Sequence, residues 1–183
     1  MFRLLEGKNV NLRVMEKEDI DFLDEFNNDI DCRGKYEPID QMSKSEQMKQ
    51  LDAAVSSPSD FKLFIIQKKD GTRIGQIYHR LSRPFKGMEI VYMLLPKEWG
   101  KGFGTEAVQL MVDYLFLSKD HARIQAIINV SNKASQRVLE KSGFQREGTM
   151  RKCIFSRGEL RNYYLYSILR EEWKEPKILT KTT

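Results

Sequence analysis

The sequence predicts a single mixed α/β domain, and three observations favour this fold class. Short runs of alternating apolar residues are interleaved with amphipathic segments of helical period, as expected for strands and helices around one core. Neither an internal repeat nor a linker rich in glycine, proline and serine divides the chain. With 183 residues, the chain is long enough to bury one full hydrophobic core.

The strands are predicted from two-residue alternation and from breaks at glycine and proline. They cover residues 10–14, 61–67, 73–79, 89–94, 123–128, 148–156 and 161–169. Asp70-Gly71 joins the second and third of these strands as a hairpin turn. Pro96 ends the fourth strand, because proline has no N–H to donate to the ladder.

Four helices are predicted from apolar residues spaced three and four apart. The first covers Ile20–Ile30, and the capping box Ser43-x-x-Glu46 opens the second. The third has one apolar face made by Val108, Met111, Val112 and Leu115. The fourth opens at the N-cap residue Asn132 and ends at Gly143. Residues 31–42 are predicted to be a loop, and the polar tail 174–183 is predicted to be loose.

Composition and charge argue against several classes of protein. The net charge of +5 comes from 31 basic residues scattered among 26 acidic ones, which indicates a mildly basic surface rather than a nucleic-acid site. Two cysteines and two histidines without metal-type spacing predict reduced thiols and no metal site. The sequence has neither an apolar signal core nor a membrane-length apolar run, so we expect a cytoplasmic protein that binds no membrane. We also expect a monomer or homodimer that binds no nucleic acid.

The most informative stretch runs from Glu89 to Ala107. It reads as an apolar strand, a short turn and a glycine-rich loop that opens a helix, with Gly100, Gly102 and Gly104 at alternate positions. Residues without a Cβ let an anion approach the backbone, and a helix start presents free N–H groups to it. The stretch therefore predicts a phosphate-binding loop.

Three kinds of phosphate ligand use such loops. A Walker loop ends in Gly-Lys-Ser/Thr, but here Thr105 directly follows Gly104, which argues against hydrolysis of ATP or GTP. Residues 102–107 fit the dinucleotide pattern G-x-G-x-x-A, yet the next strand ends at Asn129 instead of an acidic residue, and the loop lies at mid-chain. These departures disfavour NAD. The pyrophosphate of coenzyme A is the third option.

Two segments carry a family resemblance. Trp99-Gly-Lys-Gly-Phe-Gly104 resembles the acetyl-CoA loop Q/R-x-x-G-x-G/A of the GNAT superfamily of N-acetyltransferases, with Trp99 where Gln or Arg is usual. Asn132-x-x-Ser135, followed by Gly143-Phe144, resembles the second block of that superfamily. The resemblance covers roughly residues 4–173 and is greatest to the Rim-type branch of ribosomal-protein acetyltransferases.

The resemblance implies a fold and a domain arrangement. The fold is a central mixed, twisted sheet of about seven strands with helices on both faces, in the order β-α-α-β-β-β-α-β-α-β-β. Residues 1–173 would form the N-acetyltransferase domain, followed by the tail 174–183. The implied co-substrate is acetyl-CoA, without a metal, and the implied acceptor is a primary amine of a small molecule or of a protein N-terminus.

The resemblance also implies which residues bind the cofactor. They are Tyr92, Met93, Leu94, Trp99, Gly100, Lys101, Gly102, Phe103, Gly104, Thr105, Asn132, Ser135, Val138 and Lys141. Within this set, Lys101 is expected to be a mobile countercharge for the phosphates. The strand residues are expected to contact pantetheine through their backbone, so their side chains do not test this assignment.

Acyl transfer to an amine requires a base for the ammonium group and an acid for the leaving thiolate. Glu89 is the candidate base, whereas His79 is the weaker alternative because a strand-end histidine is more often structural. Many relatives carry a tyrosine four residues after Ser135, where this chain has Leu139. The resemblance therefore moves the role of the acid to Ser135 or to water. A non-catalytic acyl-CoA sensor or interaction module is the alternative function.

Overall fold

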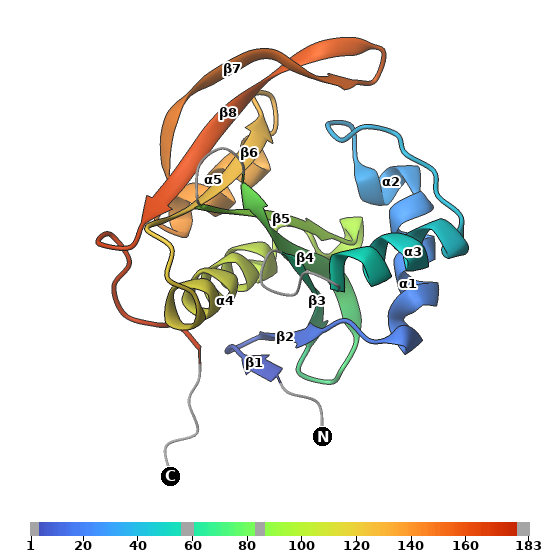
Figure 1. The fold of residues 1–183 in the computed structure, drawn as a ribbon, viewed down its shortest axis with the longest axis horizontal. Helices are drawn as coiled ribbons and strands as arrows, with labels where there is room; N and C mark the ends of the chain where they lie inside the picture. Colours follow the sequence, from blue (N-terminus) through green and yellow to red (C-terminus); the bar gives the residue numbers. More distant parts are fainter. Residues whose placement is uncertain (1–3, 56–60, 83–86, 179–183) are drawn as a thin grey trace.

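A computed structural model describes residues 4–55, 61–82 and 87–178, which form one eight-stranded sheet with helices on both faces (Figure 1). The strands are β1 Leu4–Glu6, β2 Val10–Val14, β3 Phe61–Lys68, β4 Arg73–Ser82, β5 Gly87–Leu94, β6 Arg123–Asn129, β7 Gln145–Ser156 and β8 Glu159–Leu169. Their order in the sheet is β1-β2-β3-β4-β5-β6-β8-β7. Only the β5–β6 pair is parallel among these described strands. The predicted mixed α/β fold is thus confirmed.

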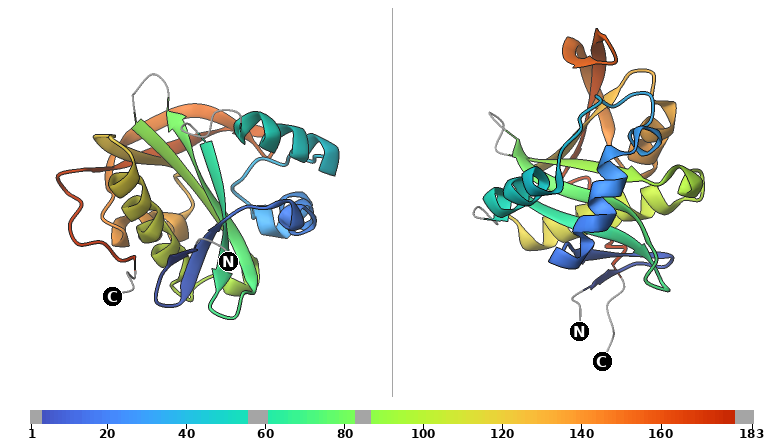
Figure 2. Two further views of the ribbon diagram at one scale, coloured as in Figure 1. Left: turned by 60° about the horizontal axis from the view of Figure 1, so that its bottom comes forward. Right: turned by 90° about the vertical axis from the view of Figure 1, so that its right-hand side faces the viewer.

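The helices lie in two layers, one on each face of the sheet. They are α1 Ile20–Asn28, α2 Ile30–Arg33, α3 Lys44–Val55, α4 Phe103–Ser118 and α5 Lys133–Lys141, with 3-10 turns at Lys17–Asp19 and Pro96–Glu98. The left view of Figure 2 shows α4 and α5 on one side of the sheet and α1 to α3 on the other. The main core lies under α4, and a smaller cluster of Leu23, Leu63 and Ile65 lies under α1.

The N-terminal region differs from the prediction in two short elements. The sheet has eight strands, not about seven, because β1 is an additional strand. The helix α2 begins at Ile30, the last residue of the predicted first helix, and otherwise lies inside the predicted loop. A three-residue strand and a four-residue helix are too short to show a period. The predicted first helix is interrupted at Asp29, whose extended backbone leaves its carboxylate free to accept the Asp31 N–H at 2.7 Å and cap α2.

The predicted local motifs are otherwise confirmed. In the capping box, the Ser43 N–H donates to Glu46 at 2.8 Å and the Glu46 N–H donates to the Ser43 hydroxyl at 3.3 Å. Gly71 has a φ of +86° in the hairpin turn, and Gly143 has a φ of +91° directly after α5. The sequence also predicts an end of the second helix at Ser56-Ser-Pro58 and a turn near Arg83-Pro84, and both lie outside the described residues.

The first part of the polar tail is held against α4. The buried carboxylate of Asp113 accepts the indole N–H of Trp173 at 2.8 Å and the backbone N–H groups of Lys177 and Ile178. The Ile178 side chain also packs on the main core. Up to Ile178 the tail is therefore not loose as predicted, and residues 179–183 lie outside the described part. None of the described helices is long and apolar enough to cross a membrane.

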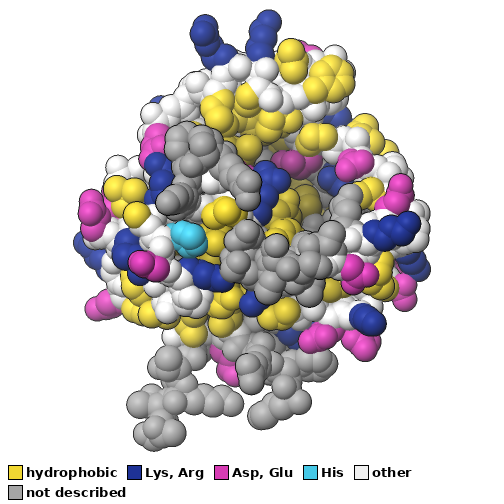
Figure 3. Space-filling model, viewed as in Figure 1, with side chains coloured by type: hydrophobic (Ala, Val, Ile, Leu, Met, Phe, Trp, Pro, Cys, Tyr) yellow, Lys and Arg dark blue, Asp and Glu magenta, His cyan; other side chains and the backbone are white. Residues whose placement is uncertain are grey.

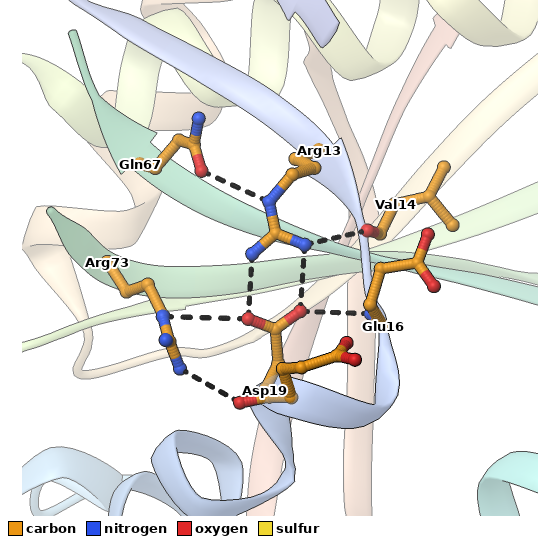
Figure 4. A network of polar contacts seen from close by, with 7 residues as sticks. Arg13, Val14, Glu16, Asp19, Gln67 and Arg73 are labelled. Atoms are coloured by element: carbon orange, nitrogen blue, oxygen red, sulfur yellow. Dashed lines mark hydrogen bonds and ion pairs between the residues drawn. The ribbon is translucent and has the colours of Figure 1, made fainter. Parts of the chain in front are cut away.

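A buried ion pair fixes the start of α1 to the sheet (Figure 4). The Arg13 guanidinium donates two hydrogen bonds to Asp19, at 2.7 and 2.9 Å, and the Glu16 N–H donates to the same carboxylate at 2.9 Å. The Asp19 side chain is only 2% exposed. Burial by itself would raise the pKa of Asp19, but these hydrogen bonds and the nearby charges of Arg13 and Arg73 outweigh it and hold the pKa below its usual range.

We expect Asp19→Asn to lower the free energy of unfolding at pH 7 by about 3 kcal/mol, because it leaves the Arg13 charge buried without its partner. A carboxyl with a lowered folded-state pKa stabilises the fold above its unfolded pKa of about 4, and this stabilisation is lost as the pH falls through the folded pKa. Urea denaturation between pH 7 and pH 3 should therefore show a steeper loss for the wild type than for the variant. The exposed ion pair of Asp21 with Lys44 provides the control, since Asp21→Asn should change little. Equal effects of the two substitutions would contradict this account.

Candidate active site

The parallel strands β5 and β6 separate soon after they pair. Their ladder contains only Met88 with Ile124 and Glu89 with Gln125. The outer edges stay paired, β5 with β4 as far as Leu94 and β6 with β8 as far as Asn129. Beyond the two paired registers, no ladder between described residues joins the inner edges. The inner edges of β5 and β6 thus form a wedge, in which an extended ligand can hydrogen-bond to the backbone like an added strand. The predicted residues Tyr92, Met93 and Leu94 lie on the β5 edge of this wedge.

The glycine-rich loop follows the end of β5 and opens α4. Gly100 and Gly102 have φ values of +74° and +86°, and nothing lies within 4 Å of the position that a Cβ would take at either residue. The first helical hydrogen bond runs from the Glu106 N–H to the Gly102 carbonyl. The N–H groups of Phe103, Gly104 and Thr105 therefore have no acceptor within the helix, and this open helix start fits a pyrophosphate.

Lys101 has an ion-pair partner at the base of the loop. Its ammonium group lies 3.0 Å from the buried carboxylate of Glu98, which also pairs with Lys68 at 2.7 Å. The hydrogen bonds from Lys68 and Lys101 hold the pKa of Glu98 below its usual range. A buried carboxylate needs such countercharges, and the role of Lys101 as a mobile countercharge for the phosphates stays a prediction.

Trp99 anchors the loop to the end of β5. Its indole N–H donates to the Leu94 carbonyl at 2.8 Å, while 53% of the residue stays exposed. This hydrogen bond makes Trp99 an anchor of the loop, and its assignment to the cofactor stays a prediction. It also takes up one backbone acceptor at the mouth of the wedge.

The start of α5 faces the wedge from the other side. The Asn132 side chain caps the helix by accepting the Ser135 N–H at 3.1 Å, as predicted for an N-cap. The Tyr92 hydroxyl crosses from β5 and donates to the Ser135 carbonyl at 3.2 Å. The Ser135 hydroxyl itself makes no hydrogen bond with the described residues. Leu139 is fully buried in the core, so position 139 presents no group to the wedge.

Val138 and Lys141, the other two predicted residues of α5, lie further from the start of that helix. Val138 packs beside Gly104, with a methyl group 3.6 Å from where a Cβ at position 104 would lie. It therefore joins α5 to the first turn of α4. Lys141 is exposed in the last turn of α5, and its carbonyl accepts from Gln109, one turn further along α4 than Thr105. Its assignment to the cofactor stays a prediction.

Glu89 lies at the apex of the wedge, in the last paired register with β6. Its carboxylate is buried and accepts two hydrogen bonds from the Arg80 guanidinium, one of them 2.9 Å long. The ion pair fixes the orientation of the carboxylate, and its role as a base stays a prediction. The alternative base, His79, is completely buried against Tyr114 of α4, and burial lowers its pKa to about 4. The burial of His79 fits the structural role that the sequence favoured for it, not the role of a base.

One part of the site had no signal in the sequence. Residues 34–37, inside the predicted loop, dock on the β7–β8 hairpin, where the Tyr36 carbonyl accepts the hydroxyls of Ser156 and Tyr163 at 3.1 and 3.3 Å. Hydrogen bonds to backbone carbonyls depend on tertiary structure and leave no pattern of residue types. Within the described residues, no group of three or more His, Cys, Asp or Glu side chains could hold a metal ion.

A splayed parallel strand pair beside a glycine-rich helix start has the form of a coenzyme A-dependent acyltransferase. The comparisons with known proteins agree: residues 9–145 match the family described as "Acetyltransferase (GNAT) domain". The chain therefore belongs to the GNAT acetyltransferase family. It is an N-acetyltransferase that uses acetyl-CoA, and the alternative of a non-catalytic sensor is not favoured.

Three similar proteins illustrate the family. The uncharacterized N-acetyltransferase YoaA of Bacillus subtilis is 32% identical over 93% of this chain and 98% of its own length. A GNAT-family acetyltransferase from Bacillus anthracis has a TM-score of 0.78 at 27% identity, covering 92% of this chain and 99% of that one. The ribosomal-protein-S5-alanine acetyltransferase of Vibrio fischeri has a TM-score of 0.80 at 22% identity, covering 94% and 100%. The fold of this last structure is consistent with the predicted likeness to the Rim-type branch.

Proposed function

We propose that the chain acetylates a primary amine by direct attack within a ternary complex. The donor would occupy the wedge between β5 and β6, and the acceptor would approach from the side of α1 to α3. The observation that carries this proposal is the pair of free inner strand edges leading to the open start of α4. The acceptor is an amine of a small molecule or of a protein N-terminus, and the enzyme acts in the cytoplasm as a monomer or homodimer, without nucleic acid.

The chain's own residues have separate tasks in this proposal. Acetyl-CoA supplies the activated acyl group when bound. Glu89, held by Arg80, takes a proton from the incoming ammonium group directly or through water, since an amine must be neutral to attack. As the N–C bond forms and the C–S bond breaks, Ser135 gives a proton to the departing sulfur. The N–H groups at the start of α4 hold the pyrophosphate.

Acetyl-CoA is expected to raise the melting temperature of this protein, while NADH and ATP leave it unchanged. A ligand that binds only the folded state stabilises it, by about 2.7 kcal/mol at a 100-fold excess over Kd, and this corresponds to a shift of about 5 °C or more. Differential scanning fluorimetry measures it directly. An unchanged melting temperature at millimolar acetyl-CoA would remove the donor assignment, and release of free thiol with a panel of amines separates an enzyme from a sensor.

A further inference from the structure

Glu37 is a half-buried acid without a counterion among the described residues. It lies between α2 and α3, and no hydrogen bond or ion pair of its carboxylate with a described residue is present. Burial raises the pKa of this carboxyl, and the more distant charge of Arg33 offsets the effect only in part. Most buried acids of this chain are paired, as Asp19 and Glu98 are. An acid left without a partner is therefore a candidate for ligand binding.

The position of Glu37 is set by its backbone. The Arg157 guanidinium donates to the carbonyls of Gly34 at 2.6 Å and of Glu37 itself at 3.2 Å. Together with the two hydroxyls that bind the Tyr36 carbonyl, these bonds fix residues 34–37 on the turn between β7 and β8. The backbone of Glu37 is thus held without using the carboxylate oxygens, which remain available to a ligand.

Glu37 lies on the face of the sheet that carries α1 to α3, from which the acceptor is proposed to approach. Its charge acts on Tyr78 of β4 and on Tyr163 of β8, and Tyr78 is also influenced by Glu89. Tyr78 lies two residues before Arg80 on β4, so both side chains project from the same face. Tyr163 is opposite Asn129 at the open end of β6. In Figure 3, the face between the β7–β8 hairpin and α2 shows hydrophobic side chains around a few acidic and basic ones.

We propose that the Glu37 carboxylate binds the positively charged ammonium group of the acceptor. This inference rests on the proposed function and narrows it to amines that are protonated at neutral pH. A carboxylate without a protein counterion attracts a cation and gains a charge-assisted hydrogen bond when the cation arrives. Arg80 is already paired with Glu89, so the cation of the acceptor would complete the charge balance on this face.

Glu37→Gln tests this inference because it keeps the size of the side chain and removes its charge. We expect KM for an alkylamine acceptor to rise about 10- to 100-fold, the range of one charge-assisted hydrogen bond. KM for a weakly basic aromatic amine, which is neutral at pH 7, should stay unchanged. Asp40→Asn is the matched control, since it removes the same charge from an exposed position of the same segment.

The outcomes separate this inference from the donor assignment. A Glu37→Gln enzyme with unchanged KM for alkylamines would overturn the role of Glu37, as would an equal rise for neutral and cationic amines. A wild-type enzyme that acetylates no protonated amine would overturn it as well. Binding of acetyl-CoA is measured independently, as the shift in melting temperature that it causes in the absence of an amine. This shift should be equal in the wild type, Glu37→Gln and Asp40→Asn.

Discussion

Gly102→Val is expected to weaken acetyl-CoA binding by about 100-fold or more while the protein stays folded. Gly102 is the N-cap of α4 with a φ of +86°, and the space where a side chain would start is open. A branched side chain would fill the place where an anion reaches the helix N–H groups. It would also strain the left-handed backbone by about 1–2 kcal/mol. Isothermal titration calorimetry of acetyl-CoA measures the loss, and circular dichroism reports the fold.

Gly158→Val is the matched control for this substitution. Gly158 lies in the turn between β7 and β8 with a φ of +85°, and nothing lies within 4 Å of its Cβ position either. The backbone strain is therefore the same, but the turn contacts residues 34–37 and not the glycine-rich loop. Acetyl-CoA should bind this variant with unchanged affinity. If Gly102→Val also binds normally, the pyrophosphate lies elsewhere.

The three loop glycines show how far a sequence pattern reaches. Their spacing suggested one common role, and it correctly predicted the open helix start. The structure divides them, because Gly100 and Gly102 adopt positive φ values, whereas Gly104 is helical. A Cβ at Gly104 would lie 3.5 Å from Leu94 and 3.6 Å from Val138, which is ordinary contact. Spacing alone cannot separate a conformational requirement from close packing between a strand and two helices.

Features that depend on distant contacts were the ones that the sequence missed. The backbone contact of the strand residues with pantetheine was expected only through the family resemblance, because the separation of β5 and β6 that would allow it is a property of the sheet and not of either strand alone. The ion pair of Lys101 with Glu98 was not expected, since nothing in the sequence predicts that Glu98 is buried and pairs with two cations. Glu37 lies inside a predicted loop and carries no sequence signal, because its placement comes from Arg157, 120 residues further along the chain.

The hydroxyl groups near α5 differ in whether they could give a proton to the leaving thiolate. Leu139 is buried and has none, and the Tyr92 hydroxyl already donates its proton to the Ser135 carbonyl. Burial also raises the pKa of Tyr92 well above its usual value, which keeps it protonated and bound in this bridge. The Ser135 hydroxyl makes no hydrogen bond within the described residues and is half-buried beside the wedge. It is therefore the hydroxyl of α5 that remains available.

Ser135→Ala is accordingly expected to lower kcat by about 10- to 1000-fold with little change in KM for acetyl-CoA, since general acid catalysis acts in the transition state and not in donor binding. Ser135→Thr, which keeps a hydroxyl, should retain more activity than the alanine variant. Asn132→Ala should act differently, because loss of the α5 cap displaces a binding element and raises KM for acetyl-CoA.

Steady-state kinetics with both substrates varied distinguishes these cases, and Ser131→Ala serves as the control. Ser131 is an exposed serine just before α5, so its removal should leave both constants unchanged. Full turnover by Ser135→Ala would mean that water or a group outside α5 protonates the sulfur. The donor site would survive that result, because the wedge and the open start of α4 do not depend on the Ser135 hydroxyl.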